Sequence, residues 1–276
     1  MSIGILGALG VLASQTPTRP SRAVARPSRV RRVRHAHIPV TWIDQDKART
    51  ATVVHLHGGS YLRGEQPRHW TWLEELGRRA DVATAMVHYR MPPRHPFPQG
   101  LDDVLAVLDA MERENLLPPG RWVLSGDEAG AALALGAAQT LADRGDLPPA
   151  LLLLAEPWGD LRRADSLDSE RRQAARMYVD GLPQEDPRLS PALAPPTALP
   201  PVHLSVGGRS PLLPEARAVA SRIEEGGGEV TLHEEAAGGE DFPVVAPDAT
   251  AQRVWRSQIA AVRAAVGQDR ETSVGA

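Results

Sequence analysis

The chain has 276 residues, 42% of them hydrophobic and 24% charged, with a formal net charge of -3. This length is enough to bury one substantial core, and the negative charge argues against nucleic acid as the main partner and favours a small molecule. The chain contains no cysteine, which excludes disulfides, thiolate nucleophiles and cysteine metal sites.

The N-terminal segment is predicted to lie outside the folded domain. Residues 3–13 are apolar but interrupted by glycine, too short for a membrane span and without the basic start of a secretory signal, so we expect a cytoplasmic protein. Residues 19–34 carry seven arginines with interleaved prolines, before the first acidic residue. Such a run is typical of a solvated tail, with a membrane surface or an acidic partner as the alternative. We therefore expect a basic, flexible segment at residues 1–38 and assign it no chemistry.

From residue 40 onward, short apolar runs alternate with longer helical patterns, as in βαβ units with a mostly parallel sheet. Strands are predicted at residues 53–56, 82–89, 122–125, 151–155, 202–206 and 230–233. Apolar residues at three- and four-residue spacing predict helices at residues 70–79, 101–113, 129–144, 212–225 and 249–266. These elements predict one domain at residues 39–268, followed by a flexible tail at residues 269–276.

The alternating pattern is interrupted between residues 158 and 200. A charged helical stretch at residues 166–179 precedes a passage rich in proline. An insertion after a central strand lies over the carboxyl edge of the sheet, where α/β proteins bind ligands. Residues 158–200 are therefore a candidate lid, and an ordinary surface excursion is the alternative.

Several motifs occur in a fixed order along the chain. His57-Gly58-Gly59 directly follows a predicted strand, and paired glycines there let backbone N–H groups face a bound oxygen. Residues 89–98 (YRMPPRHPFP) and then 101–104 (LDDV) follow, and residues 126–130 (GDEAG) lie at a strand-to-helix turn. Together these motifs closely resemble those of the hormone-sensitive-lipase-like esterases. The resemblance runs from residue 40 to the last helix and departs at Pro92 and Arg94.

This resemblance implies an α/β-hydrolase fold, in which helices flank a central, mostly parallel sheet and the cap is small. It implies an oxyanion hole made of the backbone amides of Gly58, Gly59 and Ala129, with no cofactor. Members of the family often dimerise through the last strand and helix, so a homodimer is one arrangement for this chain. For the apolar stripe of residues 249–266, burial in the core is the preferred explanation.

All three catalytic positions of the family differ in this chain. Glu128 stands where the family has its nucleophilic serine. Ser210 stands at the acid position, or Arg209 after a one-residue shift, and neither orients a histidine as a carboxylate does. Glu240 or Asp241 stands at the histidine position. We therefore expect the family's route of ester hydrolysis to fail.

Other residues are poor substitutes for this triad. No histidine follows His233, which lies in a predicted strand, several residues too early to be the base. For Ser60, in the glycine-rich loop, and Ser125, at a buried strand end, we favour structural roles. His57 and His95 belong to structural motifs of the family, and His69, His88 and His203 show no metal-ligand spacing, so we expect no metal site.

Three interpretations of Glu128 stay open, and whether the chain is an enzyme is uncertain from the sequence. The chain can be a pseudo-esterase that binds a small apolar, ester-like or carbonyl molecule. Alternatively, Glu128 can act as a general acid or base in a cyclisation, elimination or isomerisation, aided by a second carboxyl at Glu240 or Asp241. The remaining alternative is ester hydrolysis by a residual or rerouted mechanism.

Overall fold

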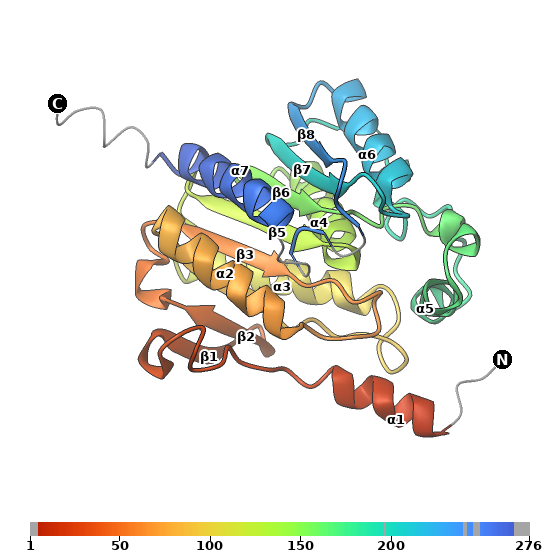
Figure 1. Cartoon of the computed structure of the whole chain (residues 1–276), viewed down its shortest axis with the longest axis horizontal. Coiled ribbons are helices and arrows are strands. Elements are labelled where there is room, and N and C mark those ends of the chain that lie inside the picture. The colour runs from red at the N-terminus through yellow and green to blue at the C-terminus, as the bar shows by residue number, and fades with distance from the viewer. Residues whose placement is uncertain (1–4, 196, 240–241, 245–248, 268–276) are drawn as a thin grey trace.

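The computed structural model describes residues 5–195, 197–239, 242–244 and 249–267. Within these residues, one sheet holds eight strands in the order β1-β2-β4-β3-β5-β6-β7-β8 (Figure 1). The strands are β1 (Val30–His35), β2 (Ile38–Ile43), β3 (Thr52–Leu56), β4 (Ala83–Val87), β5 (Trp122–Asp127), β6 (Leu151–Ala155), β7 (Val202–Gly207) and β8 (Val230–Glu235). The strand β2 is antiparallel to both of its neighbours, and the pairs from β4 to β8 are parallel. The mostly parallel sheet expected from the sequence is confirmed.

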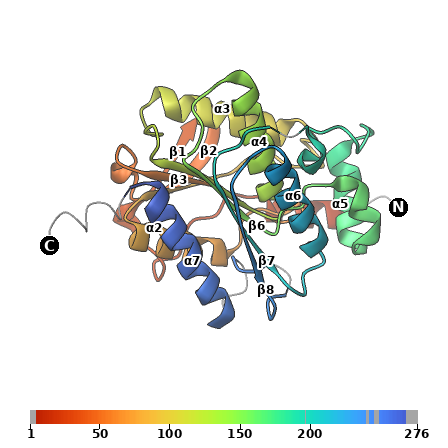
Figure 2. The same cartoon turned by 90° about the horizontal axis from the view of Figure 1, so that it is seen from above.

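Helices cover both faces of the sheet, as Figure 2 shows. The long helices of the described residues are α1 (Ile5–Ser14), α2 (Pro67–Ala80), α3 (Gln99–Arg113), α4 (Ala129–Arg144), α5 (Ser169–Val179), α6 (Leu213–Glu225) and α7 (Ala249–Ala265). Helices α2 and α7 pack on one face, and α3, α4 and α6 on the other. None of the described helices is both long and apolar enough to cross a membrane.

The predicted strands and helices of the domain are present, with ends that shift by a few residues. The structure differs from the prediction at the N-terminus, because parts of the segment expected to be flexible up to residue 38 form helix α1 and the edge strand β1. Strand β2 was not among the predicted strands. The backbone of β1 pairs with β2 over six residue pairs, from Val30 opposite Ile43 to His35 opposite Ile38. Composition alone does not distinguish a solvated tail from an edge strand, because both can be rich in arginine. On an edge strand, charged side chains discourage pairing with other chains.

The helix of the candidate lid, α5, lies beyond the carboxyl ends of the parallel strands (Figure 1). The chain reaches it from β6 through a short 3-10 helix at Leu161–Ser166. The loop after β3 and the turn between β5 and α4 also lie at these strand ends. In a parallel sheet, side chains that follow different strands meet at this edge. The fold therefore brings three candidate segments together.

Candidate functional site

The turn between β5 and α4 presents the side chain of Glu128 at the carboxyl edge of the sheet. Glu128 has φ 49° and ψ -113°, a positive φ that is strained for a residue other than glycine. Glycines allow the chain to pass closely on each side. A Cβ atom on Gly126 would collide with the backbone of Gly130, and one on Gly130 would collide with the carbonyl oxygen of Leu56. The motif around Glu128 thus maintains a sharp turn that raises one side chain out of the sheet.

The carboxylate of Glu128 lies in front of the loop that follows β3. Its Oε2 accepts hydrogen bonds from the backbone N–H groups of Gly59 and Ser60, each at 2.8 Å. Its Oε1 accepts from the hydroxyl of Ser60 at 2.9 Å and from Nε of Arg171 at 3.2 Å. Both oxygens therefore have two donors each. The space facing these two loop amides is filled by a side chain of the protein itself.

The backbone amides predicted to form an oxyanion hole are arranged differently from the expectation. Gly58 does not face this space, because its N–H donates to Oδ1 of Asp127 at 2.9 Å. The pair of amides that shares one oxygen is Gly59 and Ser60. Ala129 is buried at the first position of α4, next to Glu128. The prediction of Gly58 as a donor is therefore corrected to Ser60, since Gly58 lies one residue too close to the strand.

Arg171 is a site residue that the sequence interpretation missed. It belongs to α5 of the candidate lid, and only 6% of its side chain is exposed. Its Nη1 also donates to Oδ2 of Asp168 at 2.7 Å. A signal was present in the sequence, because Arg171 shares one helical face with Ala174, Ala175 and Tyr178, all of them buried. A buried arginine needs an anionic partner, but the sequence alone does not show that Glu128 is that partner.

Further contacts hold α5 against the site. The ring of Tyr178 stacks on that of Tyr61, with centroids 3.8 Å apart and planes 15° apart. At the other end of α5, Glu170 Oε1 lies 2.5 Å from Nη2 of Arg63. Tyr61 and Arg63 both follow the glycine loop in the sequence. The lid helix is therefore joined to the loop after β3 through an aromatic contact and an exposed ion pair, and to the turn after β5 through the buried ion pair of Arg171 with Glu128.

A buried network supports the glycine loop from below. Besides Gly58, Asp127 contacts two histidine rings, with His69 Nε2 at 3.1 Å from Oδ2 and His55 Nε2 at 3.2 Å from Oδ1. Burial disfavours the charged carboxylate, but the two rings outweigh this and hold the pKa of Asp127 well below its usual range. Asp127 is thus an ionised group that fixes the position of Gly58.

His55, His69 and Asp127 are close enough together to be considered as metal ligands, although the sequence spacing predicted no metal site. Ligand atoms of His55, His69 and Asp127 lie within 4.8 Å of one another. However, the backbone N–H of Gln66 donates to Nδ1 of His69 at 2.8 Å. In the neutral ring the proton then resides on Nε2, facing Asp127, and a protonated nitrogen is no metal ligand. The group fits a hydrogen-bond network better than a metal centre.

Ser125 takes part in contacts that resemble a catalytic triad. Its Oγ lies 3.1 Å from Nδ1 of His55, and Nε2 of His55 lies 3.2 Å from Asp127. Ser125 is only 1% exposed and His55 is fully buried within the sheet. A nucleophile has to reach the acyl carbon of its substrate, so these contacts support the strands and not a reaction.

The residues at the predicted acid position do not form a catalytic triad, and those at the predicted histidine position fall outside the described residues. Ser210, at the acid position, is 6% exposed, and its Oγ accepts a hydrogen bond from the N–H of Leu212 at 3.1 Å. Arg209 instead donates to the carbonyl oxygen of Ala237. Glu240 and Asp241 fall outside the described residues. Among the described residues, the guanidinium of Arg171 is a charged neighbour of Glu128. The second carboxyl that the sequence suggested stays a prediction.

Another buried carboxyl lies close to the β7–α6 loop. Glu215, in the first turn of α6, is 1% exposed, and its Oε2 accepts from the N–H of Asp160 at 3.2 Å. Among the residues that the structure describes, none forms a hydrogen bond with its Oε1. Burial, with the negative charge of Asp160 nearby, raises the pKa of Glu215 to about 7. This residue is therefore a proton-binding group at neutral pH.

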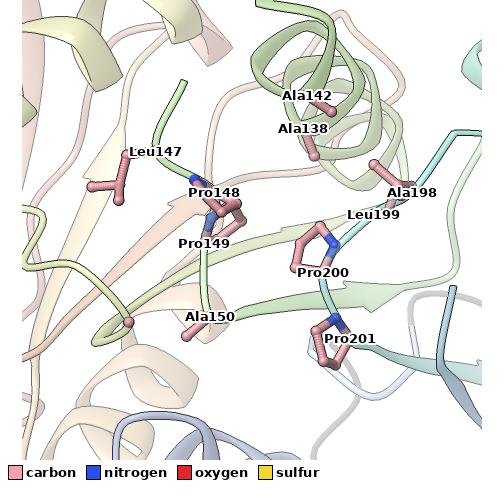
Figure 3. Close-up of a pocket in the computed structure, with 11 residues that line it drawn as sticks. Ala138, Ala142, Leu147, Pro148, Pro149, Ala150, Ala198, Leu199, Pro200 and Pro201 are labelled. Carbon is pink, nitrogen blue, oxygen red and sulfur yellow. The ribbon is translucent and has the colours of Figure 1, made fainter. Parts of the chain in front are cut away.

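A separate hollow of about 430 Å³ lies at the amino ends of the strands, away from Glu128. Figure 3 shows its apolar lining. The residues are Gly120, Ala138, Ala142, Leu147, Pro148, Pro149, Ala150, Ala198, Leu199, Pro200 and Pro201. Their side chains contain neither titratable nor hydrogen-bonding groups, which a catalytic site requires. The candidate site is therefore the region around Glu128.

Known proteins of similar sequence are hydrolases. A model of the α/β-hydrolase fold family matches residues 53–243. An acetyl-hydrolase of Streptomyces hygroscopicus is 35% identical over 210 residues, which are 72% of this chain and 70% of that protein. A putative acetyl-hydrolase of Mycobacterium tuberculosis, LipR, is 30% identical over 226 residues, 78% of this chain and 72% of that protein.

Solved structures of similar fold are esterases and lipases. The esterase LipW from Mycobacterium marinum has a TM-score of 0.81 at 26% identity, over 96% of this chain and 91% of that one. A hormone-sensitive lipase from a metagenome library has a TM-score of 0.78 at 22% identity, over 94% and 90%, which is a likeness of fold alone. The chain therefore belongs to the α/β-hydrolase fold family.

Proposed function

We propose that this chain is a pseudo-esterase, a small-molecule-binding member of its family that does not hydrolyse esters. One observation carries the proposal: Oε2 of Glu128 lies 2.8 Å from the backbone nitrogens of both Gly59 and Ser60. Acyl transfer needs such amides to stabilise the negative charge that develops on the carbonyl oxygen. A carboxylate in that place occupies the donors and repels a second negative charge.

The same contacts argue against Glu128 as a general acid or base in a non-hydrolytic reaction. A general acid must hold a proton, and a carboxyl with four donors around it would lose at least one hydrogen bond on protonation. One partner of Oε1 is the guanidinium of Arg171, which donates hydrogen bonds and cannot accept a proton. A base would need a lone pair facing the substrate, and both oxygens are engaged with the protein. Ligand binding is therefore the function that the arrangement supports best.

The proposed ligand is small and apolar, or ester-like or carbonyl-containing, and binds at the carboxyl edge of the sheet. Support comes from the position of α5 over this edge and from the acetyl-hydrolase and esterase names of the relatives. A fold does not fix the function of its site, so a member of a hydrolase family can bind a ligand without catalysing a reaction. A homodimer and a cytoplasmic location are part of the same proposal.

An assay of ester turnover tests this proposal. Wild-type protein and Glu128→Ala are compared on short-chain p-nitrophenyl esters, acetate to octanoate, against buffer. We expect both proteins to match the buffer rate. Turnover by the wild type that disappears in Glu128→Ala would contradict the proposal. A thermal-shift screen of small esters, ketones and apolar compounds should then find a ligand that still stabilises Glu128→Ala.

Ester hydrolysis by a rerouted mechanism is the second candidate, and one contact favours it. The hydroxyl of Ser60 lies 2.9 Å from Oε1 of Glu128, so a hydroxyl and a carboxylate base are adjacent. In such a route, Glu128 accepts the Ser60 proton as Oγ bonds to the acyl carbon, and then passes it to the departing alkoxide. Water completes the cycle by hydrolysing the acyl-serine.

Two substitutions separate the two candidates. If Ser60 is the nucleophile, then both Ser60→Ala and Glu128→Gln abolish turnover, whereas Ser125→Ala retains it in the fraction of protein that is folded. A burst of p-nitrophenol equal to the enzyme concentration would mark an acyl-enzyme. If the chain is a pseudo-esterase, the wild type and the three variants all hydrolyse the ester at the buffer rate.

A further inference from the structure

We infer that Gly59, Ser60 and Arg171 form a carboxylate-binding cradle whose resident ligand is the side chain of Glu128. A free short-chain carboxylate takes this place when that side chain is removed. The inference rests on the proposed function, because it assigns the loop amides a bound carboxylate and not a reacting ester. The ligand class is thus the acid anion that ester hydrolysis produces.

The donor geometry matches the two oxygens of a carboxylate. The backbone amides of Gly59 and Ser60 share Oε2, while the hydroxyl of Ser60 and Nε of Arg171 share Oε1. An ionised acceptor makes such bonds shorter and stronger than neutral ones. A neutral carbonyl has one oxygen and would leave one pair of donors without an acceptor. The cradle is therefore complementary to a carboxylate group.

Charge and burial select for an anion at the same place. Arg171 is 6% exposed at its side chain, and another of its partners, Asp168, is 49% exposed. The guanidinium lies in the protein interior, where the loss of an anionic partner is costly. The amino-terminal end of α4 begins at Ala129, directly after Glu128, and its dipole also favours negative charge. Removing the anion from this cradle takes away one partner of a buried cation and the acceptor of three further donors.

The atoms that a Glu128→Ala substitution removes correspond to acetate. Alanine retains Cβ, and the missing Cγ with its carboxylate has the size and charge of CH₃COO⁻. The variant therefore contains a vacated site with four donors, bounded by Cβ of residue 128. Formate and acetate fit within the removed volume, whereas butyrate is longer than the removed fragment. In the wild type the covalently attached carboxylate excludes all of them by its high effective concentration.

Thermal unfolding in matched salts tests the inference. Glu128→Ala and wild type are measured in sodium acetate and in sodium chloride at equal ionic strength and pH. We expect acetate to raise the Tm of Glu128→Ala by several degrees above its value in chloride, and to leave the wild type unchanged. Calorimetric titration should give one acetate per chain. Acetamide, which has the same shape without the charge, should have no effect.

A second variant shows whether the cradle is the site. In the double variant Glu128→Ala/Arg171→Met the buried cation is absent, so acetate should no longer raise the Tm above that in chloride. An acetate effect that persists in the double variant, appears equally in the wild type, or is matched by acetamide would overturn the inference. Equal Tm values of Glu128→Ala in acetate and chloride would also overturn it.

If Glu128→Ala is expressed in a poorly folded form, a refolding experiment tests the inference instead. The wild type and the variant are then refolded from urea in acetate or chloride, and the soluble yield is compared. The inference expects acetate to increase the yield of the variant alone, and equal yields in both salts would contradict it. Failure of the proposed function is a different observation, namely ester turnover by the wild type, so the two outcomes are separable.

Discussion

Nε of Arg171 lies 3.2 Å from Oε1 of Glu128, and the two side chains are 6% and 7% exposed. The pair connects the lid helix α5 to the turn after β5, two segments that are 43 residues apart in the sequence. In a buried environment, each charge depends on the other, because desolvation of a single ion is costly. The ion pair therefore couples the position of the lid helix to the stability of the site.

Arg171→Met should destabilise the protein strongly. Methionine retains the apolar stem but leaves the carboxylate of Glu128 buried without its cation. We expect a loss of about 3–5 kcal/mol in the free energy of unfolding, measured by urea denaturation at pH 7. In Glu128→Gln/Arg171→Met both charges are absent, so the loss should be smaller than in Arg171→Met alone.

An exposed ion pair between the same helix and the loop after β3 provides the matched control. Arg63 and Glu170 have side chains that are 55% and 47% exposed, and their nitrogen and oxygen lie 2.5 Å apart. Arg63→Met should therefore change the free energy of unfolding by less than about 1 kcal/mol. If Arg171→Met costs no more than this control, the buried pair does not stabilise the lid.

Much of the fold was predictable because the central strands are buried on both faces. Strands such as β6, Leu151–Ala155, consist of continuous apolar residues, and such runs between helical patterns indicate parallel strands. The edge was not predictable in the same way. In β1 the arginines dominate the sequence, and the backbone hydrogen bonds to β2 that order the strand are invisible in composition.

The site was predictable as a place but not as a set of contacts. The motif around Glu128 indicated which residue the turn presents, since glycine spacing sets local geometry. Arg171 could not be paired with Glu128 by spacing, because the contact depends on how the lid folds back. Likewise, the direction of the Gly58 amide depends on Asp127, which lies on another strand.

Restoring the family's triad should restore ester hydrolysis if the aligned positions are right. We predict that Glu128→Ser alone stays at the buffer rate on p-nitrophenyl acetate, because no base is present. The triple variant Glu128→Ser/Ser210→Asp/Glu240→His should exceed that rate by at least about 100-fold, the low end of the contribution of a positioned base. Replacing Asp241 instead of Glu240 by histidine tests the alternative position. Turnover in neither triple variant would count against the aligned positions.

Glu215 should make the protein less stable as the pH rises from acid to neutral. Its pKa is raised from 4.5 to about 7, so between these values the unfolded chain has released a proton that the folded chain retains. The free energy of unfolding then falls by on the order of 3 kcal/mol over this range from this residue alone. Glu215→Gln should remove that slope and be more stable than the wild type above pH 7.

The control for this profile is Glu225→Gln at the other end of α6, where the side chain is 58% exposed. Urea denaturation of the three proteins between pH 4.5 and 8 provides the comparison. Parallel profiles for wild type and Glu215→Gln would show that the carboxyl of Glu215 is not proton-linked to folding.

Asp127 should have the opposite pH dependence. The histidine rings beside it hold its pKa below 3.8, so its contribution to stability is present above that value and is lost as the pH falls through the lower, folded-state pKa. Asp127→Asn should cost about 2–4 kcal/mol at pH 7, because Gly58 and His69 lose an ionised partner and His55 loses a neighbouring negative charge. The difference from the wild type should shrink in acid, as measured by urea denaturation down to pH 3.

Asp109→Asn, whose side chain is 49% exposed, is the matched control and should have little effect. A constant difference between wild type and Asp127→Asn across this range would mean that the loop depends on the shape of the side chain and not on its charge.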